Sequence, residues 1–143
     1  MKQILFILFI GVITPVFSQT DSDLQLAQHY YGKGSFEKAL EYYEKIYNET
    51  PTLSIFRKYY ECLIETKDYK RAEKTLKKEI SKSKNNIDLR LQLAEFYVDR
   101  GEDSRANKIY EGLMSNHTNS PSQCISLFNS FVSLSMLNEA KGV

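Results

Sequence analysis

The sequence of 143 residues has no tryptophan, two cysteines, two histidines, three prolines and six glycines. Two cysteines cannot build the set of disulfides that holds small secreted scaffolds together. His29 and His117 lie outside any metal-binding motif, so a zinc site has no ligand set. Lysine and arginine number 19 against 18 acidic residues, so the overall charge does not point to nucleic acid or to a membrane surface. Few prolines and glycines leave room for long helices.

An apolar run stands at the N-terminus. Ile4 to Ile13 is almost unbroken in its apolar character after a short positive start, and Val16-Phe17-Ser18 is typical of a cleavage site. We therefore predict a signal peptide over residues 1–18 and an exported protein, periplasmic or secreted. The alternative is an uncleaved membrane anchor, but about ten to fourteen apolar residues fall short of the roughly twenty that span a bilayer. No membrane insertion is expected after cleavage.

The rest of the chain repeats with a period of 33 or 34 residues. Alanines recur at Ala39, Ala72, Ala106 and Ala140, each preceded by a turn residue and a polar pair. An aromatic residue or a leucine stands nine residues before each alanine and, in three copies, four residues after it. These two columns are Tyr30, Leu63, Tyr97 and Phe131, then Tyr43, Leu76 and Tyr110.

Each repeat has the pattern of two amphipathic helices joined by a turn. Gly34 and Gly101 can adopt the left-handed conformation that ends a helix, so both are predicted at the turn. Pro51 closes the first repeat, and Ser120 followed by Pro121 predicts the start of a fourth. Gly32-Lys33-Gly34-Ser35 lacks the spacing and the preceding strand of a phosphate-binding loop, so it is also assigned to the turn.

This pattern resembles the tetratricopeptide repeat (TPR) family, in an exported bacterial form, over almost all of residues 19–143. The family's small residues correspond to Ala27 and Ala39, and its closing proline to Pro51. The resemblance implies an all-α fold, an α-α superhelix or TPR solenoid of antiparallel helix pairs. Its units are expected at about 20–52, 53–86, 87–120 and, in part, 121–143. The second repeat departs from the family at Tyr60 and Glu79, and the fourth at Phe128.

The resemblance also implies the kind of function. First helices of TPR units line a concave groove that binds an extended or helical segment of a protein partner. Carried over to this sequence, the groove residues are Leu24, Gln28, Tyr31, Arg57, Glu61, Ile64, Glu65, Asp88, Leu91, Glu95, Val98, Asp99, Ile125 and Asn129. This surface is apolar along its centre and acidic in repeats two and three, so a partner with apolar anchors and some lysine or arginine is expected. The family's chaperone-tail clamp is absent, because Leu24, Gln28, Asp88 and Gln92 stand at its positions.

Two further features have structural explanations. Eight basic residues crowd the second helix of the second repeat, but Asp68, Glu73 and Glu79 interrupt them and no aromatic row accompanies them, so a solvated outer face is favoured over nucleic-acid binding. Cys62 and Cys124 stand two repeats apart, on the order of 20 Å at the usual helix spacing. This distance exceeds the limit near 7 Å between the two Cα atoms of a disulfide, so no disulfide is predicted within the chain.

No catalytic function is predicted. The histidines stand in unrelated contexts, so neither a serine nor a cysteine has an evident base. We therefore expect a protein-binding module with no cofactor, no small-molecule substrate and no nucleic-acid partner. The alternative is the N-terminal sensory or scaffolding part of a larger envelope or signalling protein, possibly attached to a catalytic module, because the last repeat stops soon after Ala140.

Overall fold

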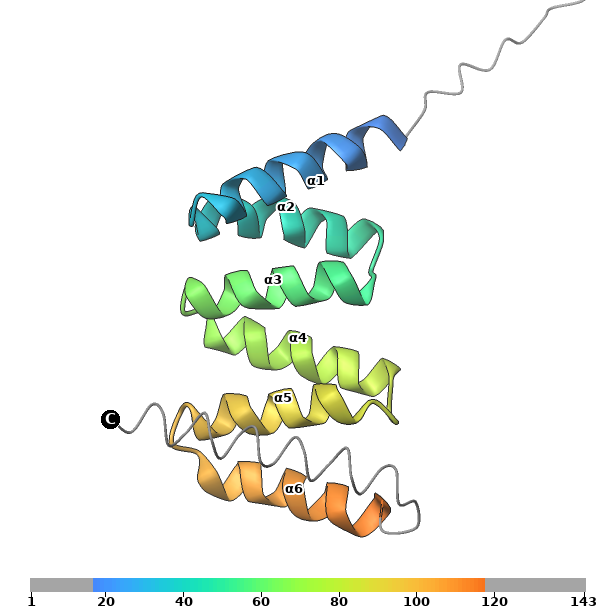
Figure 1. Ribbon diagram of the computed structural model, residues 1–143, viewed down its shortest axis with the longest axis vertical. Coiled ribbons are helices and arrows are strands. Elements are labelled where there is room, and N and C mark those ends of the chain that lie inside the picture. Colours follow the sequence, from blue (N-terminus) through green and yellow to red (C-terminus); the bar gives the residue numbers. More distant parts are fainter. Residues whose placement is uncertain (1–16, 118–143) are drawn as a thin grey trace, which may run out of the picture. The chain divides into compact units, whose positions relative to one another are not determined.

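The computed structural model describes residues 17–117, and within that range the chain forms α-helices and no strand. Figure 1 shows these helices in chain order. They are α1 (Phe17–Gly32), α2 (Phe36–Glu49), α3 (Leu53–Glu65), α4 (Tyr69–Lys82), α5 (Ile87–Val98) and α6 (Asp103–His117). The predicted all-α class is confirmed.

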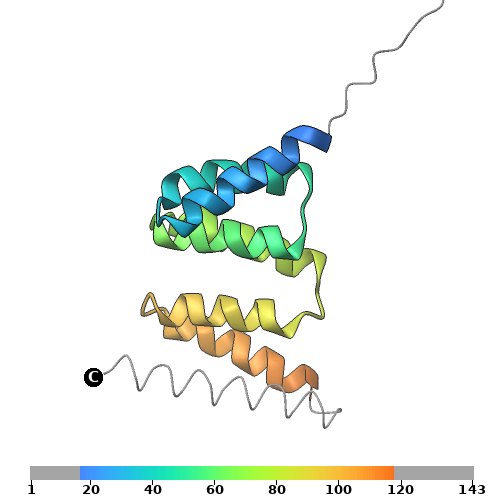
Figure 2. The ribbon, with the colours of Figure 1, turned by 45° about the horizontal axis from the view of Figure 1, so that its top comes forward.

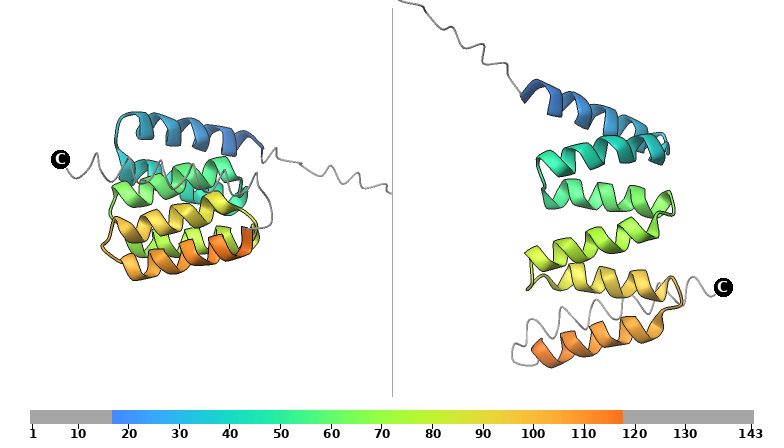
Figure 3. Two further views of the ribbon diagram at one scale, coloured as in Figure 1. Left: turned by 60° about the horizontal axis from the view of Figure 1, so that its bottom comes forward. Right: turned by 180° about the vertical axis from the view of Figure 1, so that it is seen from behind.

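The chain divides into two compact units, the first ending at Thr66 and the second beginning at Lys67. In the first unit α2 packs against α1 and α3, and in the second α5 packs against α4 and α6. Helices that follow one another within a unit run antiparallel (Figures 1 and 2). The hairpins of α1 with α2 and of α5 with α6 are also seen from behind in Figure 3. Below, α1, α3 and α5 are called first helices, and α2, α4 and α6 second helices, after their order in each repeat.

Apolar residues at helical spacing explain why these segments fold as they do. On α2 the buried residues Ala39, Leu40, Tyr43, Ile46 and Tyr47 share one side, so the helix has an apolar stripe to pack. The starts of three later helices are capped by side-chain oxygens that accept bonds from backbone N–H groups. The caps are Thr52 to Ile55 (3.3 Å), Asp68 to Arg71 (3.1 Å) and Asn86 to Leu89 (3.2 Å).

The repeating alanines lie where helices approach closely. Ala39, Ala72 and Ala106 are each fully buried, as is Ala27 on α1. A methyl side chain lets two helix backbones come together, and a larger one would overfill the contact. The burial of Ala27 and Ala39 agrees with the small-residue positions that the resemblance implies, whereas Ala140 lies outside the described residues.

The turns between first and second helices share one backbone geometry. Gly34 has a φ of 70°, Gly101 a φ of 69° and Lys67 a φ of 60°, all in the left-handed region. At the first turn the N–H of Ser35 bonds the carbonyl of Tyr30 (2.9 Å) and that of Gly34 bonds Tyr31 (3.0 Å), the pattern of a Schellman cap. The bonds at Gly101 follow the same pattern. Gly32-Lys33-Gly34-Ser35 is thus a helix-to-helix turn.

Cys62 is a buried free thiol on α3. Its burial, with the carboxylate of Glu61 nearby, raises the pKa of the thiol to about 11, so the side chain stays protonated and unreactive at neutral pH. Cys124, Ser120, Pro121 and most of the predicted signal peptide lie outside the described residues. Across 17–117, no helix has the length and apolar character to cross a membrane.

Candidate functional site

The predicted groove residues lie on α1, α3 and α5, and they differ in how far solvent reaches them. Gln28, Arg57, Glu65, Asp88 and Asp99 are exposed, and Leu24, Tyr31, Glu61, Ile64, Glu95 and Val98 are half-buried. Leu91 is buried and clusters with Leu113 of α6. Leu91 therefore serves helix packing and offers little surface to a partner. Ile125 and Asn129 lie outside the described residues.

Two of these residues meet directly across the first helices of the first unit. The hydroxyl of Tyr31 on α1 donates to Oε2 of Glu61 on α3 over 2.6 Å. Lys58, one turn before Glu61, donates to the same carboxylate oxygen at 2.8 Å and to the Tyr31 hydroxyl at 3.2 Å. Its ammonium also lies 4.2 Å from the centre of the Tyr31 ring, within the range of a cation–π contact. Tyr31 of α1 and Glu61 of α3, two of the predicted groove residues, are thus in direct contact.

The charges of this Tyr31–Lys58–Glu61 cluster stabilise one another. Partial burial of Glu61 acts to raise its pKa, but the hydrogen bonds from Lys58 and Tyr31 outweigh it and hold the pKa below its ordinary value. The hydrogen bond to Glu61 raises the pKa of Tyr31, and the same carboxylate raises that of Lys58. The Glu61 charge is therefore matched by Lys58, and the predicted acidic character is weaker on α3 than the sequence indicated.

The ring of Tyr31 packs against other aromatic side chains of the first unit. It meets Phe36 edge to face at 5.5 Å between ring centres and Tyr43 at 6.3 Å. Both partners lie on α2, the second helix of the same hairpin. Edge-to-face packing of this kind orients a ring without a hydrogen bond, so Tyr31 is fixed before any partner arrives.

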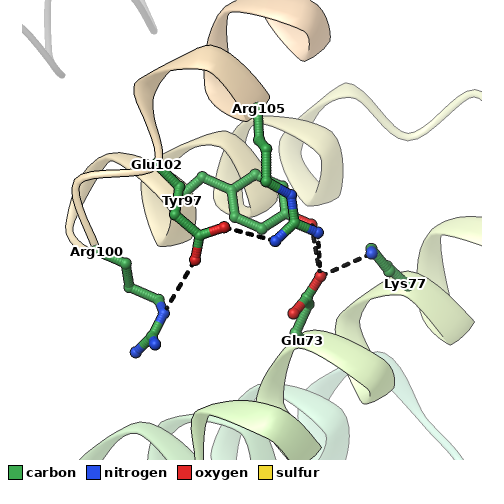
Figure 4. Close-up of polar contacts among 6 residues, drawn as sticks. All are labelled: Glu73, Lys77, Tyr97, Arg100, Glu102 and Arg105. Carbon is green, nitrogen blue, oxygen red and sulfur yellow. Dashed lines mark hydrogen bonds and ion pairs between the residues drawn. The ribbon is translucent and has the colours of Figure 1, made fainter.

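A second polar cluster lies in the second unit, away from the predicted groove residues (Figure 4). The Tyr97 hydroxyl on α5 donates to Oε1 of Glu73 on α4 at 2.7 Å. Arg105 on α6 donates to the same Glu73 oxygen at 2.5 Å and to the Tyr97 hydroxyl at 2.7 Å, and its guanidinium lies 3.9 Å from the Tyr97 ring centre. Three helices are thus joined at one carboxylate.

Two more ion pairs extend this cluster. Lys77 donates to Oε1 of Glu73 at 2.7 Å, and Arg105 also pairs with Glu102 at 2.6 Å. The bond from Lys77, with those from Tyr97 and Arg105, outweighs partial burial and lowers the pKa of Glu73 from 4.5 to about 2. We call Glu73, Lys77, Tyr97, Glu102 and Arg105 the clasp. It is a structural feature, because its charges are satisfied within the unit.

Comparisons with known proteins agree with this geometry. A family model described as tetratricopeptide repeat matches residues 63–124. This part of the chain therefore resembles tetratricopeptide repeats. The search of curated proteins found no significant match.

Solved structures with similar folds include a chaperone and a TPR domain. The Yersinia enterocolitica type III secretion translocator chaperone SycD has a TM-score of 0.56 at 14% identity, over 85% of this chain and 96% of that one. Yeast Tom70 has a TM-score of 0.56 at 15% identity, over 87% of this chain and 26% of that one. The TPR2AB domain of yeast Sti1, in its complex with pHSP90, has a TM-score of 0.53 at 16% identity, over 88% of this chain and 51% of that one. At these identities the likeness concerns the fold.

Sequence reasoning missed Lys58 and the clasp. Lys58 and Glu61 are three residues apart on one helix, a spacing that favours an ion pair and could have shown that Glu61 is not an isolated acid. The clasp has a weaker signal, because Glu73 and Arg105 lie 32 residues apart. Only the TPR period places them on neighbouring second helices.

Proposed function

We propose that this TPR chain is an exported scaffold that binds a peptide segment of a partner protein on the surfaces of its first helices. The observation that carries the proposal is the contact between Tyr31 and Glu61, which joins the predicted groove positions of α1 and α3 into one surface. Half-buried Leu24 and Ile64 on the same helices supply apolar area for the anchors of a peptide. Binding, rather than catalysis, is the activity that this arrangement supports.

The charge of the proposed surface differs between helices. On α3, Lys58 neutralises Glu61, whereas Asp88 on α5 is exposed. A segment that binds α1 and α3 of the first unit is therefore expected to have apolar side chains, and a segment that binds α5 of the second unit is expected to have a basic residue. Complementary charge of this kind mainly raises the association rate and selects among partners.

A protein partner is also consistent with the relatives of similar fold. SycD is a chaperone, and the TPR2AB domain of Sti1 was solved with pHSP90. These partners belong to those proteins, and for this chain only the class of partner, a protein or peptide, is proposed.

The binding proposal is tested by affinity capture from an envelope extract, with the bound proteins identified by mass spectrometry. The double variant Leu24→Lys with Ile64→Lys places charge on the proposed surface and is expected to lose the partner. The matched control is Asn48→Lys with Asn107→Lys, two exposed positions on second helices. Circular dichroism verifies that all three proteins fold. Equal capture by the wild type and both variants would refute the proposed surface.

Export rests on the residues before Gln19, where a positive start and an apolar run precede Val16-Phe17-Ser18. Expression of the full chain in a bacterial host, followed by fractionation and N-terminal sequencing, tests it. The expected product is periplasmic or secreted and begins at Gln19. An uncleaved product in the membrane fraction would favour an anchor, and one in the cytoplasm would exclude export.

A further inference from the structure

The second helix α4 and its flanks carry a concentration of positive charge, most of which neither the fold nor the proposed groove uses. Residues 67–84 contain eight basic and three acidic side chains, an excess of five positive charges, although the whole chain has a formal charge of only +1. The charge is therefore local, and the overall composition hides it.

The acidic residues of this segment are engaged inside the unit. Each pairs with a cation: Asp68 with Arg71 at 2.6 Å, Glu73 with Lys77 at 2.7 Å and Glu79 with Lys82 at 2.5 Å. Three of the eight cations are thereby neutralised. Lys67, Lys70 and Lys74 are exposed. Lys70 and Lys74 are four residues apart on α4 and so share one side of the helix, and Lys67 lies in the turn just before it. We call these three residues the lysine face.

The repeat does not require lysines at these positions. By the 33-residue period, Lys70 and Lys74 correspond to Glu37 and Glu41 on α2, which are exposed as well. On α6, Ser104 stands at the position of Lys70. The same helical packing thus accepts a negative, a neutral or a positive outer residue, so the lysine face is not explained by folding.

Lys67 adds a second, independent observation. Its φ of 60° lies in the left-handed region, where the other two turns have Gly34 and Gly101. A side chain with a Cβ is disfavoured in this conformation by roughly 1 kcal/mol relative to glycine. The chain therefore has a strained lysine at the edge of a positive surface where glycine would be more stable.

The chemistry of the face favours a broad anionic surface as its partner. Lysines are point charges on flexible stems and do not impose the forked geometry of arginine, and Arg71 is already paired with Asp68. Among the described residues, the large exposed hydrophobic side chains are Leu53 and Met114, neither of which lies on α4. A peptide partner needs apolar anchors, and a single-stranded nucleic acid needs stacking partners. A chain that is exported, as proposed above, does not meet cellular double-stranded DNA. We propose that the lysine face docks electrostatically on an anionic phospholipid bilayer.

The proposal is tested with the full chain and lipid vesicles in a sedimentation assay. Binding is taken as the difference between vesicles of phosphatidylcholine with phosphatidylglycerol and vesicles of phosphatidylcholine alone, so that apolar adsorption by the N-terminal segment cancels. Each lysine near an anionic surface strengthens binding by roughly fivefold. Lys70→Glu with Lys74→Glu should therefore weaken the charge-dependent binding by at least about thirtyfold, and added salt should weaken the wild type.

The matched control is Lys33→Glu with Lys108→Glu, which makes the same change in net charge at exposed positions outside the lysine face. Its charge-dependent vesicle binding should weaken by no more than about threefold, because only the net charge of the protein has changed. Equal losses in both variants, or equal wild-type binding to the two kinds of vesicle, would overturn the proposal. Tighter binding to soluble poly-glutamate than to the vesicles would also overturn it, and would indicate an acidic protein partner.

Lys67→Gly tests the proposal because it should change thermal stability and vesicle binding in opposite directions. The change relieves the left-handed conformation, so the melting temperature should rise, while the loss of one charge should weaken vesicle binding by roughly fivefold. A merely structural role would move only the first quantity. A stabilised variant with unchanged vesicle binding would remove Lys67 from the lysine face.

Discussion

The two units use the same chemical groups, a tyrosine, a carboxylate and a cation, at different places in the repeat. In the first unit Tyr31 joins the first helices α1 and α3 through Glu61, where a partner could contact them. In the second unit Tyr97 joins the first helix α5 to the second helix α4 through Glu73, and Arg105 of α6 completes the cluster. One arrangement shapes a candidate binding surface, and the other ties helices together.

Equivalent positions show how far the units differ. By the repeat period, Glu73 and Tyr97 correspond to Leu40 and Leu63 of the first unit, which are 7% and 0% exposed. At these two positions of the repeat the first unit has leucines, whereas the second unit has a carboxylate and a phenol. The repeat thus determines which positions are buried or half-buried, but not whether the side chain there is polar or apolar. Stability should therefore depend on packing at Leu40 and Leu63, and partly on pH at Glu73.

The largest effect is expected where the column is apolar. Leu63→Ala removes a side chain with no exposed surface, so it should lower the free energy of unfolding by about 2–5 kcal/mol through lost burial and a cavity. Urea denaturation measures the change. Leu53→Ala is the control, because Leu53 is 40% exposed and should lose less than about 1 kcal/mol. Similar losses in the two variants would mean that the Leu63 column contributes no core.

A smaller effect, dependent on pH, is expected in the clasp. The pKa of Glu73 is lowered from 4.5 to about 2 in the folded protein, so its stabilising contribution is complete above pH 4.5 and is lost as the pH falls toward 2. With its partial exposure discounted, Glu73→Gln should cost about 1–2 kcal/mol at neutral pH and little at pH 2. Denaturation curves over this range test the clasp.

The control for that experiment is Glu37→Gln, since Glu37 is exposed on α2. Its cost should stay within about 0.5 kcal/mol at any pH, as for most surface substitutions. A cost for Glu73→Gln that does not change between neutral pH and pH 2 would show that the side chain acts through packing and not through its charge.

The sequence predicted most of the fold because the residues that define the repeat are of types that are usually buried. Ala39, Ala72 and Ala106 recur at a fixed period, and a fixed period of small residues permits one kind of helix packing. The turns followed from Gly34 and Gly101 for a similar reason, since few other residues adopt their backbone conformation. The middle turn was harder, because Lys67 has no such preference.

The candidate site was less predictable, for a physical reason. Family positions place Tyr31 and Glu61 on first helices, but the state of a charge depends on side chains that reach it in space. Lys58 neutralises Glu61, and Leu91 turns into a cluster with Leu113. Neither outcome follows from the position of a residue in the repeat, because the period specifies helix faces and not rotamers.

Substitutions at the turns should change the free energy of unfolding by about 1 kcal/mol, with opposite signs at Gly101 and Lys67. An alanine at Gly101 would meet no atom within 4 Å, so Gly101→Ala should be destabilised by the left-handed backbone alone, by about 1 kcal/mol. Lys67→Gly should raise the free energy of unfolding by a similar amount. Part of that gain is offset, because glycine gives the unfolded chain more conformational entropy. Thermal denaturation of both variants measures the two signs. A stabilising Gly101→Ala substitution would contradict the shared turn geometry.

The smallest effect is expected at the candidate binding surface. Tyr31→Phe removes the hydrogen bond to Glu61 but keeps the ring against Phe36 and Tyr43, so the unfolding free energy should fall by only about 0.5–1 kcal/mol. The sharper measurement is the titration of Glu61 by NMR. Because the Tyr31 bond helps to lower the pKa of Glu61, the variant should raise that pKa toward its ordinary value, while Lys58 keeps part of the shift. Tyr42→Phe, on the neighbouring ring that stacks with Tyr30, should leave the pKa of Glu61 unchanged. If Tyr31→Phe also leaves it unchanged, the two first helices are not joined at this point, and the proposed surface of the first unit loses its central contact.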